Sequence, residues 1–138
     1  MKKGTVLNPE LARTIAALGH GDTIVVADAG LPIPEGVQRI DLAFAPGKPG
    51  FLDVLDAVLA EMEVERAVLA EEAGTAAPRA FLDAVEARLL ALPRVRAHGI
   101  ERVTHEELKR RCTRARAVVR TGEFTPYANV VLSSGVVF

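Results

Sequence analysis

The segment TIVVADAG at residues 23–30 decides how this sequence folds. Its first five residues are mostly β-branched and do not alternate with polar residues, which is typical of a strand covered on both faces. Asp28 follows at once, ahead of the small residues Ala29 and Gly30. A strand of this kind needs helices on both sides of its sheet. We therefore expect an α/β protein with Asp28 at the carboxyl end of a buried strand.

Strand and helix patterns alternate on both sides of this segment. Asn8 and Pro9 favour a helix start, and Gly19 is placed to end that helix after about residue 18. The residues Thr104 to Glu107 form a capping-box pattern, which places His105 at the N-terminus of another helix. Similar patterns predict helices at 51–62 and 80–92, and strands at 39–44, 67–70, 117–120 and 129–138. We expect a central sheet with helices packed on both faces.

Length and composition exclude several classes of protein. A chain of 138 residues is one domain, 1–138, and 49% hydrophobic residues supply a core. The chain has 17 basic and 18 acidic residues, so its net charge is close to zero and does not attract nucleic acid. A single cysteine forms no internal disulfide, which favours the reducing cytoplasm. The apolar runs are too short for a membrane span or a signal peptide, so we expect no membrane association.

The chain has three histidines, the side chain best suited to moving protons near neutral pH. His20 lies between Gly19 and Gly21, so a ligand can approach its ring closely. The alternative is a histidine at a helix C-terminus that only favours the helix dipole. His105 could present its ring to a ligand or belong to an ordinary helix start. We expect His98 to be a solvated loop residue.

Two further polar positions could contact a ligand. Asp28 lies where ligands gather in α/β proteins, and its carboxylate could orient an imidazole or bind hydroxyl groups. The alternative is an aspartate that caps a turn. Tyr127, Ala128 and Asn129 follow Pro126 before the last strand, and their polar groups could hydrogen-bond a polyhydroxy ligand. The alternative for them is an ordinary turn with a packed aromatic ring.

Other patterns predict no chemistry. Gly19-His20-Gly21 precedes its strand, whereas a dinucleotide-binding loop follows one. No histidine pair has metal-site spacing, so we expect no metal. We expect Cys112 to be a thiol on a helix surface, although neighbouring arginines could lower its pKa. The basic run 109–116 predicts a solvated face, with phosphate or RNA contact as the alternative.

The last residues, Gly135 to Phe138, are apolar and carry no hydrophilic overhang. Because chain ends are usually polar and frayed, we expect this end to be docked. It either closes the chain's own sheet or packs on a neighbouring subunit.

Taken together, five blocks of the sequence resemble the ribose pyranase/fucose mutarotase family. They are MKKGTVLN at 1–8, GHGDTIVVADAGLPIP at 19–34, RIDLAF at 39–44, THEELK at 104–109 and TGEFTPYANVVLSSGVVF at 121–138. The resemblance covers almost the whole chain, with 73–99 divergent, and the form of residues 27–32 is more similar to the ribose branch. It implies an isomerase of ribose catabolism, without cofactor, that interconverts the β-pyranose and β-furanose forms of D-ribose.

The resemblance also implies residue roles and an assembly. It gives His20 the role of proton donor and gives sugar binding to Asp28, His105, Tyr127, Ala128 and Asn129. It implies pentameric rings stacked into homodecamers, in which an adjacent subunit completes each active site. The alternatives are an L-fucose-type mutarotase and a non-catalytic sugar-binding module linked to ribose transport.

Overall fold

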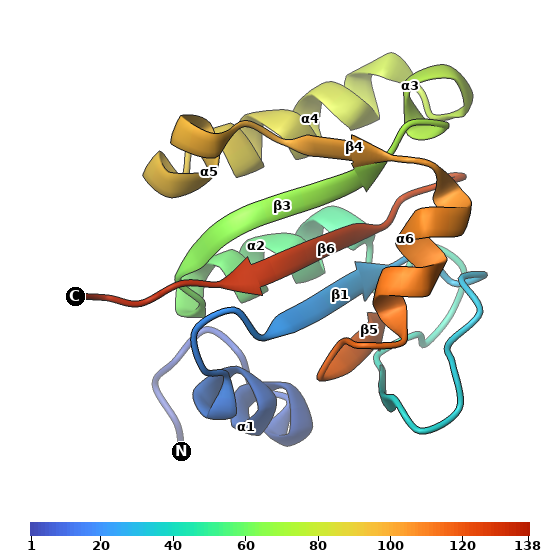
Figure 1. The fold of residues 1–138 in the computed structure, drawn as a ribbon. Helices are drawn as coiled ribbons and strands as arrows, with labels where there is room; N and C mark the ends of the chain where they lie inside the picture. Colours follow the sequence, from blue (N-terminus) through green and yellow to red (C-terminus); the bar gives the residue numbers. More distant parts are fainter.

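The computed structural model describes residues 1–138 and contains one six-stranded sheet with the order β2-β5-β1-β6-β3-β4 (Figure 1). The strands are β1 (Thr23–Ala27), β2 (Gln38–Asp41), β3 (Val64–Ala70), β4 (Glu101–Val103), β5 (Ala117–Arg120) and β6 (Val130–Ser134). β6 runs antiparallel to both of its neighbours, β1 and β3. The other neighbouring pairs are parallel, so β6 joins two parallel groups into one mixed sheet.

Helices cover both faces of the sheet. They are α1 (Pro9–Ala17), α2 (Phe51–Glu61), α3 (Ala73–Ala76), α4 (Arg79–Leu90), α5 (Pro93–His98) and α6 (His105–Cys112). One core joins strand residues to α1 through α5, and a second joins the opposite face to α6. Figure 1 shows α6 in front of the sheet and α2 behind it. The predicted α/β class, with helices on both faces, is confirmed. None of the six helices has the length and apolar composition that a membrane crossing requires.

The run of β-branched residues in β1 explains why this strand lies inside the sheet. Ile24 and Val26 enter the core beneath α2, whereas Val25 and Ala27 enter the core beneath α6. All four side chains are completely buried. A strand that is covered on both faces has no reason to alternate apolar with polar residues. The run of apolar residues therefore correctly predicted that β1 is covered on both faces.

The divergent stretch contains elements that the sequence pattern did not predict. The helix predicted at 80–92 ends at Leu90, and Pro93 begins α5, because a proline fits the first position of a helix. α3 is also unpredicted, as is β4, which follows just after the divergent stretch. Both elements are short. β3 begins at Val64, three residues before the predicted start, while β2 ends at Asp41 and not at residue 44. Local spacing finds long amphipathic elements more easily than short ones.

The C-terminal residues leave the sheet after Ser134. The Gly135 N–H still donates to the Glu63 carbonyl at 2.9 Å, and Arg94 donates to the Val136 carbonyl at 2.8 Å. Val137 and Phe138, in contrast, are 87% and 96% exposed. The alternative that this end closes the chain's own sheet is therefore wrong for Val137 and Phe138. Packing on a neighbouring subunit stays a prediction.

Candidate active site

The carboxyl ends of β1 and β5 bring two loops together. The strands are parallel neighbours, with Ala27 opposite Arg120. The Thr121 hydroxyl donates a hydrogen bond to the Ala27 carbonyl at 2.8 Å, and the Ala29 N–H donates to the Glu123 carbonyl at 2.8 Å. These contacts fix the loop after β5 beside the loop after β1. This is the place where ligands gather in α/β proteins.

Asp28 and Asn129 hold each other in a reciprocal pair. The Asp28 N–H donates to the Asn129 side-chain oxygen at 2.9 Å, and the Asn129 amide donates to Asp28 Oδ2 at 2.9 Å. Asp28 Oδ1 accepts a third bond, from the Gly30 N–H at 2.9 Å. Asn129 is 1% exposed, so water does not compete for these bonds. These bonds fix the carboxylate in one orientation. The bond from the Gly30 N–H also caps the turn after β1, so Asp28 both caps a turn and lines the site.

Tyr127 and His105 face each other beside this pair. Their rings meet edge to face, with centroids 5.0 Å apart and an interplanar angle of 82°. Tyr127 has a φ of 59°, a conformation that costs energy for any residue other than glycine. Nδ1 of His105 is buried and has no hydrogen-bond partner in the chain. Backbone strain and an unsatisfied polar atom both mark functional sites.

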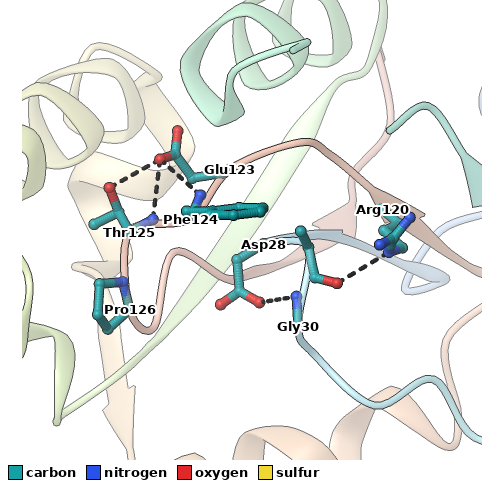
Figure 2. A pocket seen from close by; sticks show the side chains of 8 residues that line it. Asp28, Gly30, Arg120, Glu123, Phe124, Thr125 and Pro126 are labelled. Atoms are coloured by element: carbon teal, nitrogen blue, oxygen red, sulfur yellow. Dashed lines mark hydrogen bonds between the residues drawn. The ribbon is translucent and has the colours of Figure 1, made fainter. Parts of the chain in front are cut away.

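Two adjoining hollows open over these residues. One has a volume of about 280 Å³ and is lined by Asp28, Gly30, Leu31, His105, Pro126 and Tyr127. The other, of about 380 Å³, shares Asp28, Gly30 and Pro126 and adds Ala29, Arg120, Glu123, Phe124 and Thr125 (Figure 2). A small polar molecule fits a space of this size. Of the predicted residues, Asp28, His105 and Tyr127 therefore line one hollow, Asn129 is hydrogen-bonded to Asp28, and Ala128 is buried.

Sequence reasoning missed Arg120, Glu123 and Phe124, which line the larger hollow. Arg120 donates from Nε to the Ala29 carbonyl at 3.0 Å and also pairs with the Asp41 carboxylate at 3.1 Å. Phe124 is 68% exposed, and Figure 2 shows its ring between Glu123 and Asp28. All three lie at or after the carboxyl end of β5, beside the carboxyl end of β1 that Asp28 follows. Their place after a predicted strand is the signal that could have identified them.

Glu123 joins the site to helix α2. Its carboxylate accepts hydrogen bonds from the Thr125 hydroxyl at 2.8 Å, from the backbone N–H groups of Phe124 and Thr125, and from the Phe51 N–H at 3.2 Å. Burial raises the pKa of Glu123, but these hydrogen bonds outweigh it and hold the pKa below its ordinary value. Glu123 is therefore an N-terminal anchor for α2, whose own cap residue is Gly50.

We expect Glu123→Gln to lower the free energy of unfolding by about 1 kcal/mol at neutral pH, as the loss of a helix cap does. Because the folded pKa is depressed, this contribution is complete above the ordinary glutamate value of 4.5 and is lost as pH falls through the folded value. Denaturant unfolding at several pH values measures the difference. The exposed loop residue Glu35, changed to Gln, is the control. An equal effect of Glu123→Gln at pH 7 and at acidic pH would contradict the assignment.

His20 lies at the opposite end of β1. The turn that carries it is tied to β6 by the Gly21 N–H, which donates to the Ser134 carbonyl at 2.8 Å. The side chain is 61% exposed, and its Nε2 lies 2.8 Å from Glu65 Oε2. Because strands rise about 3.3 Å per residue, β1 separates this turn from Asp28 by about 16 Å. Within one chain, His20 and Asp28 therefore flank the same strand and do not face each other across a pocket.

The N-terminus of α6 confirms half of the capping box. The Thr104 hydroxyl accepts from the Glu107 N–H at 3.2 Å, but Glu107 gives no return bond, because its carboxylate binds Arg110 and Arg111. The Glu72 carboxylate instead accepts from the N–H of His105, the first residue of the helix, at 2.9 Å. This bond, a backbone hydrogen bond to the carboxylate, lowers the pKa of Glu72.

Cys112 and the basic run 109–116 have no place in the site. Cys112 is buried, and burial raises its pKa to about 11, so the expectation of a surface thiol is wrong. Arg111 is paired with Glu101 and Glu107 on an exposed face, as predicted for the basic run. No group of three histidine, cysteine or acidic side chains is arranged to hold a metal ion.

The sequence pattern of the RbsD / FucU transport protein family matches residues 1–137. A D-ribose pyranase of Variovorax paradoxus is 56% identical over 139 residues, covering all of both chains. The structure of Bacillus subtilis RbsD complexed with D-ribose is similar with a TM-score of 0.91 and 44% identity, and covers both chains completely. A fucose mutarotase from Streptococcus pneumoniae in complex with L-fucose matches over both full lengths with a TM-score of 0.79 and 25% identity. The chain belongs to the RbsD / FucU transport protein family.

Proposed function

We propose that this chain is a D-ribose pyranase, an isomerase that interconverts the pyranose and furanose forms of D-ribose. One observation carries the proposal: Asp28, His105 and Tyr127, from three separate parts of the chain, line one hollow, and the buried Asn129 holds the Asp28 carboxylate in place. The full-length relative from Variovorax paradoxus supports the reaction, and the complex of Bacillus subtilis RbsD with D-ribose supports the sugar. A fixed carboxylate and amide suit a ligand that carries several hydroxyl groups.

The reaction needs only proton transfers. Opening a cyclic hemiacetal requires a proton on the ring oxygen, while the anomeric hydroxyl loses one; closure through another hydroxyl reverses both steps. We assign the first proton to His20. Asp28 binds the hydroxyl groups and takes the anomeric proton, and His105, Tyr127 and Asn129 hold the open aldehyde. No cofactor and no covalent intermediate take part in this scheme.

Such a mechanism needs two subunits. His20 and Asp28 lie at opposite ends of β1, so the His20 end of one copy must face the Asp28 hollow of another. The exposure of the His20 ring, and of Val137 and Phe138 after the end of β6, supports this arrangement. We propose the assembly that the family resemblance implies, pentameric rings stacked into decamers. We also place the protein in the cytoplasm, where its single cysteine stays reduced.

Saturation transfer in NMR tests the reaction directly. The signal of the pyranose anomeric proton is saturated, and the transfer of saturation to the furanose anomeric proton is measured with and without protein. We expect the protein to accelerate the exchange. Unchanged exchange together with ribose binding would instead identify a sugar-binding module.

The same measurement with L-fucose separates the two branches of the family. The similarity to Bacillus subtilis RbsD, at 44% identity, is greater than the similarity to the fucose mutarotase, at 25% identity. We therefore expect a larger acceleration with D-ribose than with L-fucose. The opposite order would assign the chain to fucose.

A further inference from the structure

The His20 ring is held by one contact, with Glu65 of β3. Glu65 Oε2 lies 2.8 Å from His20 Nε2, and the Glu65 side chain is 22% exposed. The two residues are 45 positions apart in the sequence. A carboxylate can only accept a hydrogen bond, so the proton of this contact lies on Nε2 of the imidazole. The ring's other nitrogen, Nδ1, takes part in no hydrogen bond within the chain.

The backbone of β3 is shaped to present this carboxylate. The pairing of β3 with β6 shifts register between Val64 and Arg66, which leaves Glu65 as the extra residue of a bulge. Bulges often change the direction of a side chain beside an active site. Gly135 contributes from the other strand, because a Cβ there would lie 3.3 Å from the Cβ of Glu65. A glycine therefore lets the chain after β6 pass close to the bulge.

The charge at Glu65 suits a histidine partner. The hydrogen bond from His20 lowers the pKa of Glu65, so the carboxylate is ionised at neutral pH. Its second oxygen lies 4.0 Å from Nε2 of His98, on α5. The neighbouring carboxylate of Glu63, in contrast, pairs with Arg94 at 3.3 Å. Two acidic residues close together on the chain thus have different partners, and only Glu65 contacts the ring that we assign to proton transfer.

We propose that Glu65 is a positioning residue for His20. Its carboxylate holds Nε2 and leaves Nδ1 as the nitrogen that exchanges a proton with the sugar. In each cycle the proton on Nδ1 passes to the ring oxygen of the sugar, and Nδ1 regains a proton from the hydroxyl that closes the new ring. The proton on Nε2 stays in its hydrogen bond to Glu65 throughout. The assignment rests on the proposed function, because it gives His20 the role of the acid.

Glu65→Ala and Glu65→Gln test this assignment in the full-length protein. We expect Glu65→Ala to lower kcat for ribose exchange by about 10–100-fold, as the loss of a carboxylate that orients a functional histidine does. KM should stay unchanged, because Glu65 is not assigned to sugar binding. Glu65→Gln keeps an acceptor for Nε2 and should retain more activity than Glu65→Ala. Glu63→Ala is the matched control and should leave kcat unchanged.

A second readout does not depend on activity. Relaxation measurements on protein labelled with ¹³C in its three histidine rings report how well each ring is ordered. We expect the His20 ring to lose order in Glu65→Ala and to keep it in Glu65→Gln and Glu63→Ala.

The outcomes separate the two proposals. An active wild-type protein, with kcat and His20 ring order both retained in Glu65→Ala, would overturn the role of Glu65 and leave the function standing. A wild-type protein that does not accelerate exchange would overturn the function, and the ring order would still decide whether Glu65 positions His20. Should Glu65→Ala not fold, Glu65→Leu takes its place, because leucine fills similar space and accepts no hydrogen bond. A His20 ring that stays ordered in Glu65→Leu would contradict the positioning role.

Discussion

Replacing His20 with alanine is expected to slow protein-catalysed ribose exchange by about 10²–10⁴-fold, the usual contribution of general acid catalysis. The side chain is 61% exposed and packs in neither core, so the fold should survive the change. Saturation transfer gives the rate, and circular dichroism checks the fold. A folded His20→Ala protein with the wild-type rate would remove His20 from the mechanism.

Combining two inactive variants tests where the two halves of each site come from. His20→Ala and Asp28→Asn change residues at opposite ends of β1, so a site shared between subunits can contain an intact half from each. Random co-assembly of the two co-expressed variants should make about a quarter of the sites complete. The pair His20→Ala and Glu65→Ala is the control, because both changes affect the same half-site. Activity no higher than the average of the separate variants would contradict a shared site.

Gly122→Ala is expected to give the largest loss of stability. A Cβ at this position would lie 2.5 Å from the backbone N and O of Lys48 and 2.6 Å from the Ala45 carbonyl oxygen. Gly122 also accepts from the Gly47 N–H and donates to the Pro49 carbonyl. The backbone must therefore move, and these bonds weaken. We expect the free energy of unfolding to fall by about 3 kcal/mol or more, the upper range for overpacking.

Denaturant unfolding measures this loss. Gly74→Ala is the matched control, since nothing lies within 4 Å of a Cβ there and the residue is in helix α3. That change should leave stability equal or slightly higher. Gly122 is followed directly by Glu123, so we also expect the Gly122→Ala protein to bind ribose more weakly. Wild-type stability in Gly122→Ala would show that the loop of residues 45–49 can move aside at little cost.

The sequence predicted the residues of the Asp28 hollow because their chemistry depends on which end of a strand they follow. Asp28 comes directly after β1, and the loop of Tyr127 and Asn129 lies between two predicted strands. The contact between Asp28 and Asn129 joins residues 101 positions apart, and only the antiparallel pairing of β6 with β1 brings them together. No local pattern contains that pairing.

The position of His20 shows that closeness in the sequence does not establish closeness in space. Residues 20 and 28 are close in the sequence, but a strand of five residues lies between them and holds them apart. The contact between His20 and Glu65 depends on a bulge in β3, and bulges leave no periodic signal. The stretch 73–99 shows little helical periodicity because α3 and α5 are too short for apolar residues to recur on one face.

The central place of β6 has a consequence for biosynthesis. β6 follows every other strand and helix in the sequence, yet it lies between β1 and β3 and connects the two parallel groups of strands. While a ribosome is still translating the codons before residue 130, the nascent polypeptide has both inner strand edges unpaired, and such edges invite aggregation. We therefore expect the sheet to be completed only after residues 130–134 have been synthesised.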